Sequence, residues 1–393
     1  MLLVLALALA SPTQATPGKL TLEARDGTLR HRSLAGWSSE GWAESDAIAL
    51  RFEGLGALES GLADAGLVAW FTLANGDRVR GAVVGGAGDR LDVRLAGAVP
   101  LPLDVEELRE LVFPARADES AQRGFAAPEH GDRLYWLRGK TFDRVDGTVE
   151  EFASEGLVFD SVLGKKLFPW REVGALFIET LADPSAKRLP MQVCVELADG
   201  GRLRGSLGAC SETRIQLALD ERRALELPLA AISELVRADG SVAFLSELRP
   251  ARATEGWLGD DEPGMRWPFR VDRAVAGGPL LVGGQVYPRG FGVHAPSRLE
   301  FELDGSWKTL RGAVAIDDSV LLLPYRGSVE FSITLGASSE PAWRSGRVRG
   351  GEAPVALPAL DLNGVHTIAL EVSMDERFFV ADRAAWLRML LVR

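Results

Sequence analysis

The amino-acid sequence predicts an all-β protein in which several small β-barrel-like repeats precede an antiparallel β-sandwich. Three observations carry this prediction. Apolar and polar residues alternate in short runs, Gly-containing turn signals separate these runs, and one strand-turn-strand pattern recurs along the first two thirds of the chain. An alternation with a period of two is typical of half-buried strands, and many short strands at regular spacing are typical of barrels and sandwiches. We expect no long helices.

Length and composition set broad limits. The chain has 393 residues, of which 47% are hydrophobic and 25% charged, enough for roughly two to four domains with ordinary cores. The net charge of −11 argues against binding a nucleic-acid backbone, which needs clustered Lys and Arg. It leaves open a neutral ligand such as a sugar.

The N-terminus has the layout of a secretory signal. An apolar run from Leu2 to Ala10 is followed by Thr13 and Ala15, which suit positions −3 and −1 of a cleavage site. We therefore expect a signal peptide at residues 1–15 and a secreted or periplasmic protein. No Lys or Arg precedes Lys19, so an upstream start or a simple apolar tail remains an alternative. No later stretch reaches the roughly 18 apolar residues that a membrane span needs.

Three segments of the chain share a strand, a turn, a second strand and a glycine: residues 70–81, 142–149 and 193–205. A proline follows each shared glycine after 21, 22 and 23 residues (81 to 102, 147 to 169 and 205 to 228). After each proline comes an apolar pair three residues apart. A degenerate fourth copy begins near Leu20. We therefore place repeats one and two at residues 18–115 and repeats three and four at residues 133–248.

Each repeat is expected to be a small, strongly bent sheet. Asn75-Gly76 and Asp199-Gly200 supply the positive φ that a tight hairpin needs, and the prolines suit the start of a strand or an edge strand. The repeats resemble Sm-like small β-barrels in strand count and in their opening. Because they lack basic clusters, RNA binding is not carried over, and we interpret them as a spacer or docking platform.

Two further features concern the connections. Segments 116–132 and 249–264 are polar and rich in Gly, Pro and charge, so we interpret them as linkers. Cys194 and Cys210 flank the second hairpin signal. In an exported chain such a pair is a disulfide candidate, but two small buried core residues are an equal alternative. The cysteine and histidine spacing does not suit zinc.

The region 265–393 is expected to form the sandwich. Clean alternation marks Leu299–Leu303, Val329–Leu335 and His366–Val372, as expected for antiparallel strands with one buried face.

The same region contains seven blocks in a fixed order: Gly278–Leu280 with Val282–Gly284, Tyr287–Ser297, Val314–Asp318, Gly327–Phe331, Trp343–Ser345, Asp382–Trp386 and Met389–Val392. In these blocks the chain resembles the NPCBM family of carbohydrate-binding modules. The resemblance implies a jelly-roll-like β-sandwich and an association with carbohydrate-active or surface proteins.

The matching positions also imply a set of carbohydrate-binding residues. Sugar sites need planar apolar faces together with amide, carboxylate or guanidinium groups for the hydroxyls. The residues that supply them are Tyr287, Arg289, His294, Asp317, Asp318, Trp343, Asp382 and Trp386. Arg289 is favoured for hydroxyl contact. For others a structural role is the alternative: His294 as a buried hydrogen-bonded ring, the two neighbouring aspartates as turn caps and Trp386 as a core residue.

Two departures from the family pattern bear on binding. Arg383 and Ala385 replace the His and the second Asp of the family's Asp-His-Ala-Asp-Trp motif, so sugar binding could be altered or lost. The acidic stretch before it is shortened to residues 373–377, which argues against a calcium site. We therefore expect no cofactor.

No catalytic motif is recognisable in the sequence, and no carboxylate pair stands in the setting that glycoside hydrolysis requires. The sequence thus predicts an exported, non-catalytic glycan-binding protein with the repeats as platform. Its expected partners are glycans and envelope proteins, without nucleic acid. The alternatives are an envelope scaffold or assembly factor whose module has lost sugar binding, and a hydrolase of unrecognised type.

Overall fold

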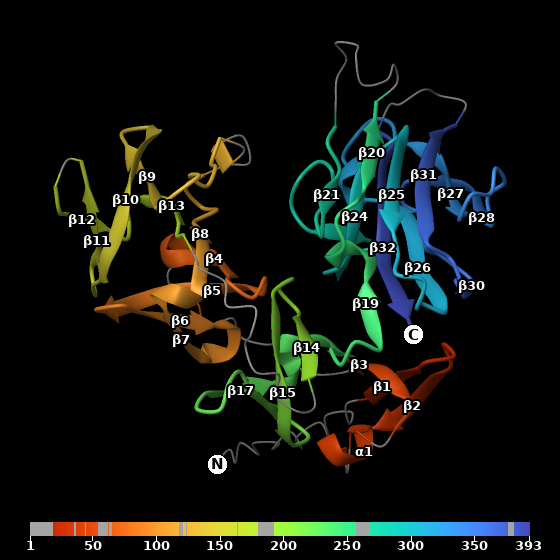
Figure 1. The fold of residues 1–393 in the computed structure, drawn as a ribbon, viewed down its shortest axis with the longest axis horizontal. Helices are drawn as coiled ribbons and strands as arrows, with labels where there is room; N and C mark the ends of the chain where they lie inside the picture. Colours follow the sequence, from red (N-terminus) through yellow and green to blue (C-terminus); the bar gives the residue numbers. More distant parts are fainter. Residues whose placement is uncertain are drawn as a thin grey trace, which may run out of the picture.

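The computed structural model describes most of the chain and is built almost entirely from strands (Figure 1). Among the described residues, α1 (Ser39–Ala43) is the one α-helix, and short 3₁₀ turns join several strands. No helix in this part of the chain has the length and apolarity to cross a membrane. The described residues are 19–34, 37–43, 45–53, 62, 65–117, 121–122, 124–162, 164–179, 192–256, 267–375 and 381–393.

The first two thirds contain three five-stranded units and a partial one, and the all-β prediction is confirmed. In each full unit the first strand pairs with both the second and the fifth strand, and the third strand pairs with the second and the fourth. The partial unit consists of β1 (Lys19–Ala24), β2 (Leu29–Ser33) and β3 (Ala47–Glu53). The strands of the full units are β4 (Val68–Leu73), β5 (Arg78–Ala87), β6 (Arg90–Leu95), β7 (Pro100–Asp104) and β8 (Leu108–Val112); β9 (Asp132–Arg138), β10 (Thr141–Phe152), β11 (Gly156–Ser161), β12 (Lys166–Pro169) and β13 (Val173–Phe177); and β14 (Gln192–Leu197), β15 (Arg202–Cys210), β16 (Arg214–Ala218), β17 (Ala224–Pro228) and β18 (Ile232–Arg237). The 3₁₀ turns of these units are η1 (Ala65–Leu67), η2 (Ala96–Ala98), η3 (Val105–Glu107) and η4 (Leu229–Ala231).

The shared glycines have a common steric reason. Gly81 and Gly147 lie in the second strand where it pairs with the third, and Gly205 lies one residue before that pairing begins in its own unit. A Cβ there would come within 2.9, 2.0 and 2.5 Å of a carbonyl oxygen on the neighbouring strand. These close approaches let the second strand bend between two partners, and only glycine fits without displacement. The turn glycines Gly76 and Gly200 have φ of +84° and +86°, as a hairpin signal requires.

The units associate through their outer strands. The fifth strand β8 pairs with β13 of the next unit, and β18 pairs with β3 of the partial unit. One hydrophobic core runs through all four units, and the apolar pairs predicted after each proline are buried in it (Leu108, Leu111, Val173, Leu176, Ile232 and Leu235). The repeats therefore form one continuous body with a shared core.

The rest of the chain forms a sandwich of two antiparallel sheets beside the repeats (Figure 1). Its main core contains the large side chains of Phe291, Phe301, Phe331 and Trp386, as expected where two inner faces interdigitate. One sheet contains β19 (Val242–Phe244), β21 (Arg270–Val271), β24 (Gly290–His294), β26 (Thr309–Ile316), β29 (Val355–Ala356), β30 (Leu360–Asp361) and β32 (Arg383–Val392); the other contains β20 (Arg252–Glu255), β25 (Ser297–Glu302), β27 (Ser328–Leu335), β28 (Trp343–Arg349) and β31 (Thr367–Met374). A hairpin of β22 (Leu280–Val282) and β23 (Gln285–Tyr287) and the turns η5 (Leu245–Glu247) and η6 (Asp318–Val320) complete it.

Several expectations about connections need correction. Residues 249–264 are not simply a linker, because β20 pairs with β25, and β19 already pairs with β32, so the sandwich begins before residue 265. In segment 116–132, Ala117 is fully buried, and Phe125 packs on Tyr135 with ring centroids 4.6 Å apart. Local polarity suggested linkers, but a few apolar anchors and backbone pairing decide these positions. The predicted signal peptide lies outside the described residues.

The cysteines are not bonded to each other. Both are free thiols, Cys194 buried and Cys210 half-buried. In the hairpin of β14 and β15, Cys194 is opposite Arg204, which leaves Cys210 six residues further along its strand. The disulfide alternative is therefore wrong, and the alternative of small packed residues describes Cys194.

Candidate functional site

The eight residues predicted to contact carbohydrate do not form one surface. Four of them are buried: Arg289 and Asp382 at 1% exposure, Asp317 at 2% and Trp386 at 0%. The other four, Tyr287, His294, Asp318 and Trp343, are half-buried. The buried four cannot reach a ligand in this structure, and their place in the site is corrected below.

Arg289 faces the repeats and not the solvent. Its Nε donates to Oε1 of Glu196 in β14 over 2.6 Å, and its Nη2 lies 3.3 Å from Oε1 of Glu247. Its guanidinium carbon lies 4.9 Å from the centre of the Phe244 ring. The rigid fork of donors that favoured Arg289 for a sugar is instead used on protein carboxylates, so its predicted role in sugar contact is wrong.

The two neighbouring aspartates anchor a hairpin. Oδ1 of Asp317 accepts the amide of Ser319 over 2.9 Å, and Oδ2 accepts the amide of Leu281 over 3.0 Å. Asp318 accepts the amides of Gly283 and Gly284 over 3.0 and 2.8 Å. Both carboxylates thus satisfy backbone donors, as the turn-cap alternative predicts. Asp317 is removed from the ligand set.

Trp386 and Asp382 are also structural. Trp386 packs edge-on against Phe331 in the core, with ring centroids 5.0 Å apart, so the core alternative holds for it. Oδ1 of Asp382 accepts the amide of Ser328 over 2.9 Å, while its Oδ2 is buried without a hydrogen-bond partner. Burial raises the pKa of Asp382 to about 6, although the hydrogen bond from the Ser328 amide lowers this pKa. Asp382 therefore holds a proton more readily than an exposed aspartate.

Tyr287 and Trp343 lie apart from each other. Tyr287 ends the β22–β23 hairpin, pairs with Leu280 and packs against a small apolar cluster. Trp343 begins β28, the edge strand of the other sheet, and packs against the main core. The structure therefore does not bring these two aromatic residues to one binding face.

One half-exposed cluster does bring suitable groups together, and we call Trp267, His294 and Arg383 the rim cluster. His294 ends β24, Arg383 begins β32, and the two are opposite each other in the sheet. The imidazole stacks on the Trp267 indole, with centroids 5.3 Å apart and an interplanar angle of 21°. The Arg383 guanidinium lies 5.6 Å from the centre of the same indole.

The protonation of the rim cluster follows from its contacts. Nδ1 of His294 lies 2.9 Å from the carbonyl oxygen of Ala295, which can only accept, so Nδ1 carries the hydrogen. Burial lowers the pKa of His294, and the charge of Arg383 adds to this effect. The imidazole is therefore neutral near pH 7, and its Nε2 is an acceptor.

Chemically, the rim cluster suits hydroxyl groups beside an apolar face. It offers one acceptor on His294, guanidinium donors on Arg383 and a half-exposed indole. Trp267 was not among the predicted residues, and Arg383 was noted only as a departure. The only sequence signal for Trp267 is its position at the start of the sandwich pattern. In the described part of the chain no group of three His, Cys, Asp or Glu residues is placed to hold a metal ion.

Comparison with known proteins bears on the sandwich. Residues 241–392 match the NPCBM/NEW2 domain family, which confirms the resemblance read from the sequence. A curated relative, alpha-1,3-galactosidase B of Akkermansia muciniphila, is 34% identical over 122 residues, which are 30% of this chain. The matched part is 14% of that relative's length.

Solved structures give weaker likenesses. A CBM51 module from Clostridium perfringens GH95 in complex with methyl-galactose is 20% identical, with 38% of this chain and 99% of that chain covered and a TM-score of 0.33. The tandem CBM51 modules of a family 98 glycoside hydrolase from Streptococcus pneumoniae are 13% identical, with 95% and 88% covered and a TM-score of 0.30.

Proposed function

We propose that the protein is an exported, non-catalytic glycan-binding protein whose sandwich binds carbohydrate at the rim cluster, with the repeats as platform. The observation that carries the proposal is the half-exposed Trp267–His294 stack beside Arg383. It lies in a domain whose family is named for carbohydrate binding. Aromatic faces and planar donors are the groups that sugar sites require.

The rim cluster is held by the sheet and does not need to form on binding. His294 and Arg383 are fixed by pairing between two central strands, and Nη1 of Arg383 donates to the Ser319 carbonyl over 3.3 Å. A site whose side chains are already oriented loses less conformational entropy when a ligand binds. This supports recognition by the folded surface alone.

Calorimetric titration of the full chain with a panel of neutral saccharides tests the proposal. Galactosides come first, because the curated relative is named a galactosidase. We expect binding that falls at least tenfold in Trp267→Ala and in His294→Ala, since each removes part of the contact. Trp343→Ala is the matched control on the other sheet and should bind as the parent does. Binding that depends on Trp343 and not on Trp267 would contradict the rim assignment.

The scaffold alternative has one specific observation in its favour. The sandwich uses Arg289, Arg311 and Arg388 to contact the repeats, through carboxylates or backbone carbonyls. A domain that already docks on protein surfaces through arginines is suited to assembly. The same titrations separate the two functions, because a folded protein that gives no heat with any saccharide supports the scaffold. Release of reducing ends from polysaccharides would contradict both.

A further inference from the structure

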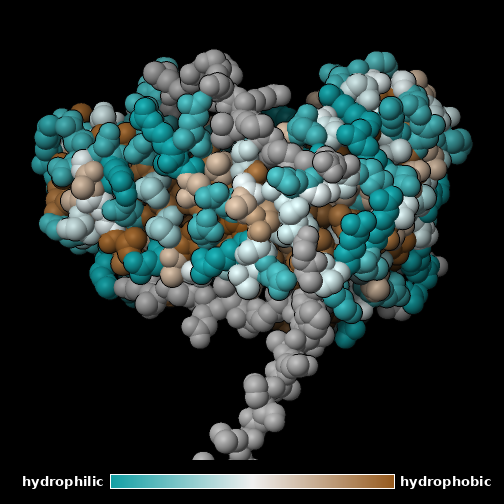
Figure 2. All heavy atoms as spheres, turned by 90° about the horizontal axis from the view of Figure 1, so that it is seen from below, coloured by the Kyte–Doolittle hydropathy of each residue, from teal (hydrophilic) through white to brown (hydrophobic). Residues whose placement is uncertain are grey.

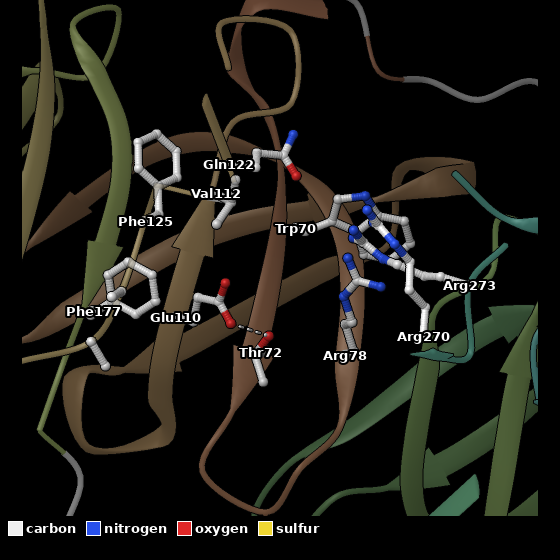
Figure 3. Close-up of a pocket in the computed structure, with 12 residues that line it drawn as sticks. Trp70, Thr72, Arg78, Glu110, Val112, Gln122, Phe125, Phe177, Arg270 and Arg273 are labelled. Carbon is white, nitrogen blue, oxygen red and sulfur yellow. Dashed lines mark hydrogen bonds between the residues drawn. The ribbon is translucent and has the colours of Figure 1, made fainter. Parts of the chain in front are cut away.

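A cavity of about 470 Å³ lies where the repeats meet the sandwich. Strands β4, β5, β8 and β13 contribute side chains to it, together with Gln122, residues 125–127 and the start of the sandwich at Arg270 and Arg273 (Figure 3). Its volume is within the range of small-ligand sites. The rim cluster does not line this cavity.

One wall of the cavity is cationic. Arg78, Arg270 and Arg273 line it, and Figure 3 shows them gathered beside Trp70. Glu110 is the one carboxylate among the lining residues that the structure describes, and it accepts the Thr72 hydroxyl over 3.2 Å. Arg78 and Arg270 together carry more positive charge than the single described carboxylate, Glu110, offsets, in a chain whose net charge is −11.

Arg78 is held against an aromatic ring in this wall. Its guanidinium carbon lies 4.0 Å from the centre of the Trp70 ring. The charges of Glu110 and Asp272 both act on Arg78, but Asp272 is already engaged by Arg202 over 2.8 Å. Burial and the charge of Arg273 lower the pKa of Arg78 to about 9. An anion in the cavity would offset this repulsion.

The opposite wall is apolar. Phe125 and Phe177 stand across the cavity from the arginines, next to Val112 (Figure 3). Phe125 is fixed by contact with Tyr135 and, edge-on, with Phe142, at centroid distances of 4.6 and 5.2 Å. The cavity therefore has two chemically different sides, and a ligand that suits it carries an anionic group on an otherwise apolar-faced ring.

Figure 2, which views the molecule from below, shows hydrophobic residues in the middle of that face and hydrophilic residues flanking them.

We propose that this cavity binds an acidic sugar residue, with its carboxylate against Arg78, Arg270 and Arg273 and its ring against Phe125 and Phe177. Guanidinium groups match a carboxylate through paired donors, and aromatic rings pack against the C–H face of a sugar. The anionic group follows from the arginines alone. The choice of a sugar as its carrier rests on the proposed glycan-binding function.

Titration of the full chain with methyl β-glucuronide and methyl β-glucoside tests the proposal, because the two probes differ only in the carboxylate. We expect the glucuronide to bind at least tenfold more tightly than the glucoside at low salt, and the difference to shrink as salt is added. Arg270→Gln should lower the affinity for glucuronide at least tenfold. Arg270 is half-exposed and ion-pairs with none of the described residues, so this variant should remain folded.

Arg344→Gln, on the far sheet and paired with Glu330, is the matched control and should bind glucuronide as the parent does. Trp267→Ala should also leave glucuronide binding intact, which separates this site from the rim cluster. Equal affinity for the two glycosides, no binding of the glucuronide, or an Arg270→Gln variant that binds like the parent would overturn the proposal. If acetate binds as tightly as the glucuronide, the assignment of a sugar ligand is wrong and the cavity is only an anion site.

Discussion

Arg289 and Glu196 form a buried ion pair between the sandwich and the repeats. Nε of Arg289 donates to Oε1 of Glu196 over 2.6 Å, and both side chains are 1% exposed. Around them, Asp272 forms an ion pair with Arg202, and Glu247 forms one with Arg204. In these two pairs the sandwich supplies the carboxylate and the repeats supply the arginine, whereas in the pair of Arg289 and Glu196 the sandwich supplies the arginine. The two parts of the chain are therefore joined by a shared charge network and not only by a peptide connection.

A second ionic cluster joins the same two parts. Arg388 of β32 contacts Glu234 of β18 and Glu23 of β1 at 2.6 and 3.0 Å. Its φ is +48°, a conformation that side chains rarely adopt and that persists only where surrounding contacts determine it. Arg311 also donates hydrogen bonds to the carbonyl oxygens of Ala24 and Arg25. Together the two clusters fix the sandwich against the platform.

Replacing Arg289 with Met should destabilise the protein by about 3–5 kcal/mol, because Glu196 would stay buried without its partner. Glu196→Gln in the same chain should recover part of this loss. Chemical denaturation measures both variants. Arg298→Met is the control, since Arg298 is 39% exposed and pairs with exposed carboxylates, where the loss should stay within about 1 kcal/mol. Similar losses for the two arginines would contradict a buried docking pair.

The sequence could predict structural features that depend on neighbouring residues, but not contacts between residues that lie far apart in the chain. Hairpins, strand alternation and the shared glycines are local features of the sequence. The structure forms the hairpins that these features predict around Gly81, Gly147 and Gly205. The role of Arg289 is not local, because its partner Glu196 is 93 residues away. An arginine in a family motif has the same sequence pattern whether it faces a ligand or a neighbouring unit.

The cavity between the repeats and the sandwich illustrates the same limit. Trp70 and Arg78 belong to a recognised repeat, whereas Arg270 and Arg273 follow a segment expected to be a linker. No periodicity connects these residues, because the docking of two units creates the site. The rim cluster was partly accessible to prediction, since His294 lies in a recognised motif, but Trp267 lies outside every recognised block.

Gly205→Ala should destabilise the repeats by about 1–3 kcal/mol or more, because the added Cβ would lie 2.5 Å from the Ala218 carbonyl oxygen and 2.9 Å from Leu217. Gly208→Ala in the same strand is the matched control. There the Cβ would meet the end of the Gln216 side chain at 2.9 Å, which can move away. Thermal unfolding compares the two, and equal losses would argue against a steric reason for the shared glycine.

Both thiols should be free in the unfolded protein, and only one should react in the native state. Burial raises the pKa of Cys210 to about 11 and that of Cys194 further still, so little thiolate is present near pH 8. We expect titration with a thiol reagent to find two groups in denaturant without reductant. In the native protein Cys210 should react slowly, and faster as the pH approaches 11. Fewer than two thiols in denaturant would indicate a disulfide.

Asp382 should make the protein less stable as the pH rises from about 4 to about 6. Its pKa is 3.8 when unfolded and about 6 when folded, so the folded state binds more protons in this interval and the free energy of unfolding falls with increasing pH. The contribution is fully present below pH 3.8 and lost above about 6, and it amounts to at most about 3 kcal/mol. Two groups act on Asp382 besides burial: the Ser328 amide, which lowers its pKa, and Asp375, whose charge raises it.

Other carboxylates titrate in the same range, some with the opposite sign, so the difference in unfolding free energy between the parent and Asp382→Asn isolates this group. We expect the parent to lose stability relative to the variant between pH 4 and pH 6. Asp304→Asn is a control of opposite sign, because hydrogen bonds from Ser306 lower the pKa of Asp304, and there the parent should lose stability relative to the variant as the pH falls. A parent-to-Asp382→Asn difference that stays constant from pH 4 to pH 7 would mean that Asp382 is ionised in the fold. Its buried Oδ2 would then carry charge without a partner below pH 6, and the end of the sheet beside the rim cluster would be negatively charged in the pH range where we expect it to be neutral.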